Sequence, residues 1–177
     1  RATPHTIGTP NLWILGSSDQ SAQIAAHFGR PFSYAHFINP EHGQTIMDVY
    51  RSMFRPSNGL DKPLSNVCAF AICAPTTSEA QYLAKSRDLW RTQLEKGELG
   101  PYPTPEEADS YPYSQEERMA LDRRRASYLV GNPEQVRRAI EALAIQFGVQ
   151  EVMLVTITHD FEARLRSYEL IASAFNS

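Results

Sequence analysis

The alternation of strand-like and helix-like segments constrains the fold of this chain more than any other feature. Four short apolar segments are each followed by a stretch whose apolar residues recur with helical spacing. The predicted strands are residues 11–15, 32–37, 66–74 and 151–158. Strands connected through helices run parallel in one sheet, so the pattern predicts an α/β fold. An open doubly wound sheet and a stretch of TIM-type (β/α)8 barrel both fit this alternation, and the periodicity does not separate them.

The turn that follows the first predicted strand is the candidate binding site. Gly16 permits a sharp turn of the backbone, and Ser17 and Ser18 then open a helix predicted over residues 18–28. A helix N-terminus carries free N–H groups and a partial positive charge, and serine hydroxyls add hydrogen-bond donors. This combination predicts an anion site of the kind that holds a cofactor phosphate. Ser18 also suits a plain N-cap that satisfies its own helix, so both interpretations stay open at this point.

The third predicted strand, residues 66–74, is a continuous apolar run, as expected for a strand covered on both faces. The helix after it is predicted to start at Thr76, with Glu79 at the spacing of a capping box. Four apolar residues of that helix form the predicted buried stripe: Ala80, Leu83, Trp90 and Leu94.

Residues 99–114 are rich in proline and tyrosine. This composition predicts an ordered insertion or loop that lies over other structure and contains neither a regular helix nor a central strand. A helix is expected to resume over residues 115–125. The three arginines at its end, residues 123–125, are predicted to form a solvated or salt-bridged face rather than an anion site, because many acidic residues lie nearby in the sequence.

The last strand–helix unit carries the strongest local signals. Asn132, followed by Pro133 and Gln135, predicts a capped helix start, and Gly148 predicts where that helix stops. The chain then passes through the fourth strand into a final helix with these apolar residues: Leu165, Tyr168, Ile171, Ala172 and Phe175.

Size and composition fit one globular domain without a nucleic-acid or membrane partner. The 177 residues carry a formal net charge of −3, which gives no electrostatic footprint for nucleic acid. No apolar run approaches the ~20 residues that span a bilayer, and the N-terminus carries no apolar segment of signal-peptide type. The chain starts with Arg1 rather than methionine, and we therefore expect it to begin partway through a longer gene product.

The cysteines and histidines point away from disulfide and metal chemistry. Cys68 and Cys73 lie in one predicted strand with side chains on opposite faces, so a disulfide between them is not expected. We interpret them as reduced, buried residues of a cytoplasmic protein. The five histidines show no close paired spacing of zinc type, and no metal site is predicted. A Ser-His-Asp hydrolase is disfavoured because the chain lacks a G-x-S-x-G elbow.

Several segments of the sequence share their order and spacing with a known family. The opening match reads PNLWILGSSDQSA over residues 10–22, and GRPFSYAHFINP follows over residues 29–40. Shorter matches are YR with FRPS within residues 50–57, VGNPEQV at 130–136 and RLRSYELIA at 164–172. Taken together, these segments resemble the bacterial-luciferase-like flavin-dependent monooxygenases, a family of bacterial oxidoreductases, nearly from end to end.

The resemblance implies a TIM-type (β/α)8 barrel of roughly twice this length, with this chain as its C-terminal half, strands five to eight. Residues 1–177 then form a single domain with a Pro/Tyr-rich insertion, and the N-terminal half of the barrel lies outside this chain. Members of the family hold reduced FMN, or in some cases the deazaflavin F420, at the carboxyl mouth of the barrel. The resemblance assigns binding of the cofactor phosphate to the turn after the fifth strand: Gly16, Ser17, Ser18 and Ser21.

The resemblance also implicates residues near the reacting ring of the cofactor. His36, at the end of the sixth strand, is implied as the catalytic residue, which donates a hydrogen bond to a flavin oxygen or a peroxide, and Phe37 as a wall of the pocket. A histidine held by a neighbouring carbonyl is the structural alternative. His159 and Asp160 follow the eighth strand, where barrel active sites assemble, although Asp160 also suits a helix cap.

The implied function is that of a monooxygenase/oxidoreductase that uses reduced FMN and O₂ to oxidise a small organic substrate. A flavin reductase that supplies the reduced cofactor is an implied partner. The open edges of half a barrel predict a homo-oligomer or pairing with the missing barrel half. Two alternatives stay open: a non-catalytic flavin- or phosphate-binding α/β module, and an inactive truncated remnant.

Overall fold

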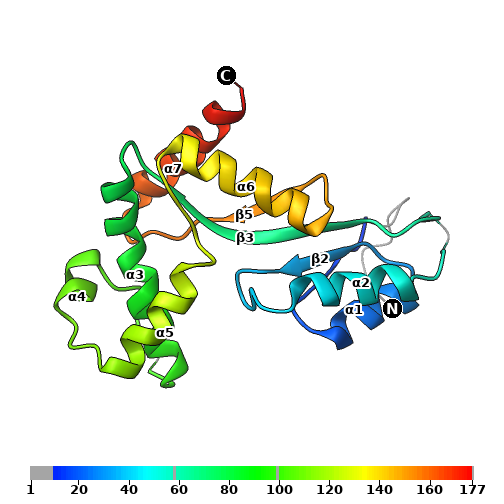
Figure 1. The fold of residues 1–177 in the computed structure, drawn as a ribbon, viewed down its shortest axis with the longest axis horizontal. Helices are drawn as coiled ribbons and strands as arrows, with labels where there is room; N and C mark the ends of the chain where they lie inside the picture. The colour runs from blue at the N-terminus through cyan, green and yellow to red at the C-terminus, as the bar shows by residue number, and fades with distance from the viewer. Residues whose placement is uncertain (1–9, 58, 99, 177) are drawn as a thin grey trace. The chain divides into compact units, whose positions relative to one another are not determined.

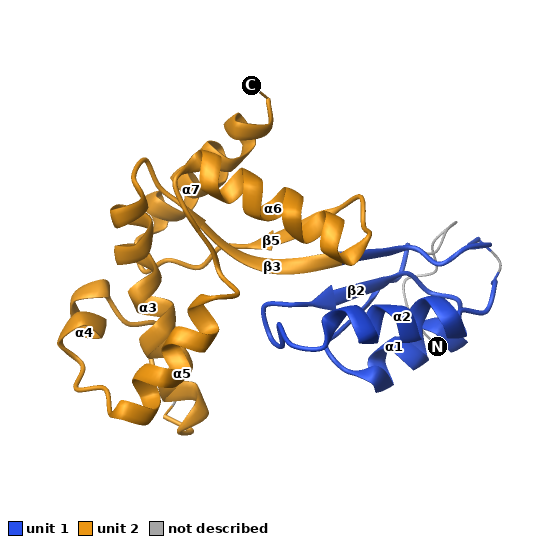
Figure 2. Cartoon of the chain, viewed as in Figure 1, with its two compact units in different colours: residues 1–66 blue, residues 67–177 orange. Residues whose placement is uncertain are grey.

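Strands and helices alternate along most of the chain, with three consecutive helices after the third strand, and three pairs of strands run in parallel (Figure 1). The computed structural model describes residues 10–57, 59–98 and 100–176. The chain divides into two compact units, residues 1–66 and 67–177 (Figure 2). The α/β class predicted from the sequence is therefore confirmed, whereas the grouping of residues 1–177 into one domain stays a prediction.

The first unit contains two strand–helix repeats. Its elements are β1 (Ile14–Gly16), α1 (Asp19–His27), β2 (Phe32–Ala35) and α2 (Gly43–Met53). β1 and β2 pair in parallel, and Gly16 lies opposite Tyr34. Because neighbouring parallel strands end at the same edge, the segments that follow β1 and β2 lie next to each other.

The core of the first unit lies between β2 and the two helices. Phe32 on β2 is fully buried, and its ring packs against the buried ring of Tyr50 on α2 with 5.4 Å between the centroids. α1 contributes three fully buried alanines: Ala22, Ala25 and Ala26. Such small side chains let the helix pack closely.

The second unit is built on a long strand, β3 (Ser65–Cys73), which begins at the boundary between the units. β3 pairs in parallel with β5 (Val152–Val155) through Val67–Phe70, and with β4 (Leu129–Gly131) through Ala71–Cys73. All of β3 after its first residue is buried, as the apolar run predicted. The helices are α3 (Thr77–Glu95), α4 (Pro105–Ser110), α5 (Gln115–Arg125), α6 (Pro133–Phe147) and α7 (Phe161–Phe175).

The local signals of the last unit predicted α6 correctly. The Asn132 side chain accepts the N–H of Gln135, and the Gln135 side chain accepts the N–H of Asn132, both at 3.0 Å. Pro133 is the first helical residue, and Gly148 ends the helix in the left-handed region at φ 59°. The predicted apolar face is buried: Val136, Ile140, Leu143 and Phe147.

The insertion contains a helix that the sequence analysis predicted to be absent. α4 begins at Pro105, with Thr104 as its N-cap and Glu107 completing a capping box. Proline removes no hydrogen bond at the first helical position, so its presence starts this helix rather than excluding it. The signal was the sequence Thr-Pro-Glu-Glu at residues 104–107.

The stripe predicted on α3 is only partly buried. Ala80 is buried, but the other three predicted residues are only half-buried: Leu83, Trp90 and Leu94. The buried face of the helix instead includes two charged residues, Arg87 and Asp88. β4 was not predicted, because three residues carry too little periodicity to indicate a strand.

The two cysteines are free, as predicted. No disulfide joins Cys68 and Cys73, both of which are buried in β3, and burial raises the pKa of the Cys73 thiol to about 11.

Among the described residues, none of the helices has both the length and the apolar character that crossing a membrane requires. A cytoplasmic location stays a prediction.

Candidate functional site

The turn between β1 and α1 is closed by two serines that bond to each other. The Ser18 hydroxyl accepts the N–H of Ser21 at 3.3 Å, and the Ser21 hydroxyl accepts the N–H of Ser18 at 3.2 Å. The Ser21 hydroxyl also donates to the Ser18 carbonyl oxygen at 2.6 Å. This reciprocal capping box confirms that Ser18 is the N-cap of α1.

Gly16 ends β1 directly beside this cap. A Cβ at position 16 would lie 2.2 Å from the Ser21 Oγ atom and 2.3 Å from the Ser21 Cβ atom. Glycine is therefore needed for α1 to start this close to the end of the strand. The neighbour that requires it is Ser21, and close approach by a cofactor phosphate stays a prediction.

The capped turn leaves several hydrogen-bond donors for a ligand. Asp19 and Gln20 are the first two residues of α1, where a helix supplies no carbonyl partner for the backbone N–H groups. Ser17 is half-buried, and within the described residues its hydroxyl has no hydrogen-bond partner. These donors and the positive end of the helix dipole favour a bound anion. The Asp19 carboxylate opposes an anion, although its exposure to solvent weakens that repulsion.

The loop that follows β2 is tied to the same turn. Asn39 donates a long hydrogen bond, 3.5 Å, to the Ser17 carbonyl and accepts the N–H of Glu41 at 3.1 Å. The hydroxyl of Tyr34, a fully buried residue, donates to the Asn39 carbonyl at 2.6 Å. Burial, with Asp19 as a second cause, raises the pKa of Tyr34 to about 12, so the hydroxyl keeps the proton that it donates. The loop after β2 is thus held beside the β1–α1 turn.

His36 directly follows β2, at the sheet edge where Gly16 ends β1. Only 7% of His36 is exposed, and its backbone N–H donates to the Tyr34 carbonyl at 3.0 Å. Burial lowers the pKa of the imidazole, so the ring is neutral at pH 7. A neutral ring donates through one nitrogen and accepts through the other, which suits a polar ligand atom better than a phosphate charge. Phe37 beside it is half-buried, and the catalytic role of His36 stays a prediction.

In the second unit, Asp160 is a helix cap. Its carboxylate accepts the N–H of Ala163 at 2.6 Å at the start of α7, which confirms the capping interpretation. His159 is exposed. The pKa of Glu106 on α4 is lowered mainly by a hydrogen bond from Tyr82, with His159 as a smaller cause, and the functional role predicted for His159 stays a prediction. Within the described residues, no cluster of His, Cys, Asp and Glu is placed to hold a metal ion.

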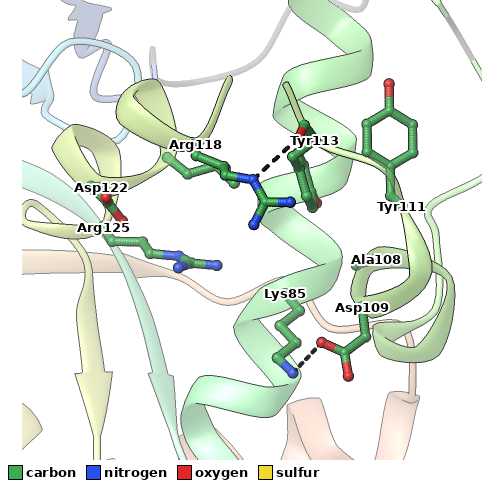
Figure 3. Close-up of a pocket in the computed structure, with 9 residues that line it drawn as sticks. Lys85, Ala108, Asp109, Tyr111, Tyr113, Arg118, Asp122 and Arg125 are labelled. Carbon is green, nitrogen blue, oxygen red and sulfur yellow. Dashed lines mark hydrogen bonds and ion pairs between the residues drawn. The ribbon is translucent and has the colours of Figure 1, made fainter. Parts of the chain in front are cut away.

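A groove that the sequence analysis did not predict lies between α3, α4 and α5 (Figure 3). Its volume is about 420 Å³. Lys85 on one wall pairs with Asp109 at 2.7 Å, and the Arg118 Nε atom donates to the Tyr113 carbonyl at 3.2 Å. Arg125 also lines the groove and has an acidic partner of its own. Because its cations already have partners in the protein, the groove is a structural seam rather than an open anion site.

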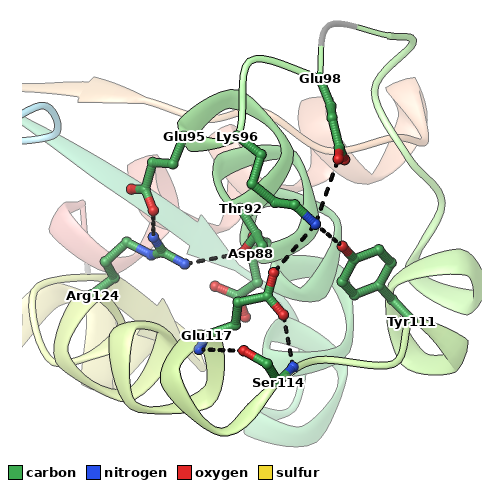
Figure 4. A network of polar contacts seen from close by, with 9 residues as sticks. All are labelled: Asp88, Thr92, Glu95, Lys96, Glu98, Tyr111, Ser114, Glu117 and Arg124. Carbon is green, nitrogen blue, oxygen red and sulfur yellow. Dashed lines mark hydrogen bonds and ion pairs between the residues drawn. The ribbon is translucent and has the colours of Figure 1, made fainter.

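A polar network joins the end of α3 to the insertion and to α5 (Figure 4). Lys96 donates to the Tyr111 hydroxyl at 2.9 Å and pairs with Glu117 at 3.6 Å. Arg124 pairs with Glu95 at 2.6 Å. These contacts hold the Pro/Tyr-rich segment and α5 against α3.

The charged residues inside α3 complete this seam. The Asp88 carboxylate pairs with Arg125 at 2.7 Å, so Arg124 and Arg125 confirm the salt-bridged face predicted for the end of α5. Burial raises the pKa of Asp88, and Arg125 is the strongest of the cations that oppose this rise. The buried guanidinium of Arg87 lies 3.8 Å from the centroid of the Phe70 ring, a cation–π contact. Sequence periodicity gives no signal for a charged residue whose partners come from other elements.

Parallel strands that end at a capped, hydroxyl-rich helix start and a buried neutral histidine define an α/β protein with a candidate phosphate site. The sequence model described as luciferase-like monooxygenase matches residues 1–151, and the chain belongs to that family. The protein YceB of Bacillus subtilis (strain 168) is 38% identical over 170 residues, which cover 96% of this chain and 51% of YceB. A luciferase-like monooxygenase of Escherichia coli (strain K12) is 33% identical over 159 residues, 90% of this chain and 48% of that protein.

Solved structures share the fold. The crystal structure of apo-MsnO8 matches with a TM-score of 0.86 and 34% identity, over 98% of this chain and 53% of that one. The oxygenating constituent of 3,6-diketocamphane monooxygenase, from the CAM plasmid of Pseudomonas putida and in complex with FMN, matches with a TM-score of 0.60 and 19% identity. That likeness covers 93% of this chain and 48% of the other. The chain spans about half the length of the curated relatives it matches.

Proposed function

We propose that this chain supplies the flavin-phosphate site of a monooxygenase that uses reduced FMN and O₂ to oxidise a small organic substrate. The observation that carries the proposal is the β1–α1 turn. There, the reciprocal cap of Ser18 and Ser21 does not use the Ser17 hydroxyl or the first two N–H groups of α1, which stay available to a ligand. Membership of the luciferase-like monooxygenase family supports the reaction class.

The donor set of this turn fits a phosphate monoester. Hydroxyl and backbone N–H donors at a helix N-terminus match the acceptor oxygens of a phosphate without requiring a cationic side chain. One structure of the same fold holds FMN, and another, at a TM-score of 0.57 and 13% identity, is an F420-dependent secondary alcohol dehydrogenase in complex with an F420–acetone adduct. We favour FMN because a deazaflavin serves hydride transfer better than reaction with O₂.

The residues around the turn have distinct proposed roles. When bound, the reduced flavin supplies the electrons that activate O₂. The Ser17 hydroxyl binds the phosphate together with the first two N–H groups of α1. Ser18 and Ser21 hold the turn that presents these donors. Gly16 lets the helix start close to the strand. His36, neutral and buried, donates a hydrogen bond to a ligand oxygen at the end of β2.

The fold that we propose around this site is the C-terminal half of a (β/α)8 barrel. Within the described residues, β1 pairs only with β2 and β5 pairs only with β3, so each has one unpaired edge. Unpaired edges of this kind are normally covered or closed into a barrel. The relatives are about twice as long as this chain, so they contain enough further residues for the other half of such a barrel. We also propose that a flavin reductase supplies the reduced cofactor. The chain is further proposed to form a homo-oligomer or to pair with the missing barrel half.

The sharpest test of the phosphate site is Ser17→Ala, because the Ser17 hydroxyl takes no part in the capping box. We expect this variant to weaken FMN binding about tenfold, the effect of losing one hydrogen bond to a charged oxygen. Riboflavin, which lacks the phosphate, should bind the variant and the parent chain equally. Calorimetric titration measures both ligands, and Ser52→Ala on the exposed face of α2 is the matched control. An equal loss for FMN and riboflavin would contradict the assignment.

The non-catalytic flavin-binding module is the second candidate function, because the chain spans only about half of its relatives. Oxygen consumption by reduced FMN separates the two functions. Binding of FMN with substrate oxidation supports the monooxygenase. Binding with O₂ consumption no faster than that of free reduced FMN supports the module, and failure to bind either flavin supports a truncated remnant.

A further inference from the structure

Tyr34 on β2 and Tyr50 on α2 are both fully buried in the core of the first unit. The ring of Phe32 lies near both, with centroid distances of 6.5 Å to Tyr34 and 5.4 Å to Tyr50. A buried tyrosine hydroxyl needs hydrogen-bond partners, and each of these hydroxyls finds them at backbone carbonyls. The two side chains are thus alike in burial and in the kind of partner, and they differ in which end of β2 they reach.

The Tyr50 hydroxyl lies at the end where β2 begins. It donates toward the carbonyl oxygens of Arg30 and Leu64, each at 3.0 Å, and accepts the N–H of Leu64 at 3.1 Å. Arg30 and Leu64 come just before β2 and β3. The candidate phosphate turn follows the other end of β1, which pairs in parallel with β2. Tyr50 therefore joins segments at the sheet edge away from the candidate site.

The Tyr34 hydroxyl lies at the end where β2 stops and supports the loop that leads to α2. It donates to the Asn39 carbonyl at 2.6 Å, with the Glu41 carbonyl as a second acceptor at 3.2 Å. The first part of the loop is also held by its backbone, since the Asn39 N–H donates to the Ala35 carbonyl at 3.3 Å. The end of the loop lacks a side-chain cap for α2, and its N-cap residue, His42, takes the left-handed value φ 60°. That conformation is unfavourable for a residue other than glycine, so the loop depends on support from Tyr34.

Asn39 connects this loop to the phosphate turn. Its side-chain N–H donates to the Ser17 carbonyl at 3.5 Å, and the N–H of the same peptide unit, on Ser18, donates to the Ser21 Oγ atom at 3.2 Å. Because a peptide unit is planar, partners on both its C=O and its N–H restrict its orientation. The rotamers open to the Ser17 side chain depend on this backbone orientation. Asn39 therefore influences the direction of the Ser17 hydroxyl.

We propose that Tyr34 is a positioning residue of the phosphate site: through Asn39, it holds the Ser17 peptide in the orientation that presents the Ser17 hydroxyl to the phosphate. This role rests on the phosphate site put forward under the proposed function. A donor that is already held in its binding orientation loses less conformational freedom when the ligand arrives. Loss of the Tyr34 hydroxyl should therefore weaken phosphate binding without removing any group that touches the phosphate.

Tyr34→Phe removes the hydroxyl and keeps the buried ring, and Tyr50→Phe is the matched control. Calorimetric titration of each chain with FMN and with riboflavin gives the ratio of the two affinities, which reports the contribution of the phosphate. We expect Tyr34→Phe to lower this ratio about threefold, the effect of losing one supporting hydrogen bond, and Tyr50→Phe to leave it unchanged. Urea unfolding should show that both variants are folded and less stable than the parent chain, because each loses a buried hydrogen-bonded hydroxyl.

A double-mutant cycle tests whether Tyr34 acts through Ser17. In a chain that already carries Ser17→Ala, Tyr34→Phe should leave the ratio of affinities unchanged, because the donor that Tyr34 positions is absent. Asn39→Ala should reproduce the loss seen in Tyr34→Phe, because it removes the link between the two residues at a half-buried position. An undiminished effect of Tyr34→Phe in the Ser17→Ala chain refutes a route through Ser17.

The parent chain separates the role of Tyr34 from the proposed function. A preference of the parent chain for FMN over riboflavin that Tyr34→Phe leaves intact refutes the role of Tyr34 alone. An equal loss of that preference in Tyr50→Phe shows that the effect comes from the core as a whole, and it also refutes this role. Equal binding of FMN and riboflavin by the parent chain refutes the phosphate site, and the role of Tyr34 with it.

Discussion

The starts of α1 and α6 are built alike, yet only the first leaves an additional hydroxyl and two helix-end donors for a ligand. Each helix follows a short strand that ends in glycine, Gly16 or Gly131, and each opens with a capping box. In both, a Cβ on the glycine would collide with the third helical residue, at 2.2 Å from Ser21 Oγ and 2.5 Å from Gln135 Oε1. The same local solution therefore occurs in both units.

The α6 start is closed by groups of the protein itself. Pro133 has no N–H to offer, and the Gln135 Oε1 atom accepts both the Asn132 N–H at 3.0 Å and the Thr77 hydroxyl at 2.7 Å. The α1 start has no proline and one more residue, Ser17, between the glycine and the cap. One proline and one additional serine thus separate a structural helix start from a candidate binding site.

Alanine at the two glycines should produce the largest difference. We expect Gly16→Ala to lower the free energy of unfolding by about 3 kcal/mol, because the new methyl group meets Ser21 close to its backbone. Gly131→Ala should cost about 1 kcal/mol, since its nearest neighbour is the far end of the Gln135 side chain and the Gln135 Cβ atom is farther away, at 3.0 Å. Urea unfolding measures both. A larger loss for Gly131→Ala would break the proposed parallel between the turns.

Lowering the pH should destabilise the protein through His36, which follows β2 beside the α1 start. Burial lowers the pKa of native His36 below its value of about 6.5 in the unfolded chain, so the unfolded state binds the proton more readily. The stability that neutral His36 contributes is fully present above pH 6.5 and is lost as the pH falls through the native pKa. The free energy of unfolding then changes by at most about 1.4 kcal/mol per pH unit. Urea unfolding between pH 5 and 8 measures the slope. We expect His36→Gln to flatten the dependence of stability on pH, and His159→Gln, at an exposed position, to leave it unchanged. Identical slopes in the parent chain and in both variants would exclude His36 as the cause.

Removing the N-caps should destabilise both helices but affect FMN binding at only one of them. Ser18→Ala and Asn132→Ala should each lower the free energy of unfolding by about 1 kcal/mol, the usual loss for a helix N-cap. Only Ser18→Ala should also weaken FMN binding. Thermal unfolding and FMN titration on the same samples provide the two readouts, and weaker FMN binding in Asn132→Ala would show that the α6 start also serves the cofactor.

The smallest expected loss of stability comes from removing the Thr77 hydroxyl, which contacts the start of α6. Thr77→Val removes the hydroxyl that donates to Gln135, while Gln135 keeps its bond from the Asn132 N–H. We expect a loss of about 0.5 kcal/mol in the free energy of unfolding and no change in FMN affinity. Denaturant titration measures the loss. A drop in FMN affinity in this variant would count against α6 as a purely structural element.

The sequence predicted the candidate turn better than it predicted the surroundings. Gly16 and the capping role of Ser18 follow from interactions within a few residues, so they are readable from the chain alone. The neutral state of His36 is not, because it depends on how deeply the rest of the first unit buries the ring. The sequence also did not predict that α3 buries charged residues. Asp88 pairs with Arg125 of α5 and Arg87 lies against the ring of Phe70 on β3, and both partners are far away in the sequence.

By itself, the sequence determined the parallel α/β class, the helix caps and the position of the hydroxyl-rich turn, because these depend on short-range hydrogen bonding and on periodicity. Only the tertiary structure decided that β4 pairs with the end of β3, that α3 buries charges, and that the apolar residues of α7 remain mostly exposed. Periodicity shows that a helix has an apolar face. Which element covers that face depends on contacts between residues far apart in the chain.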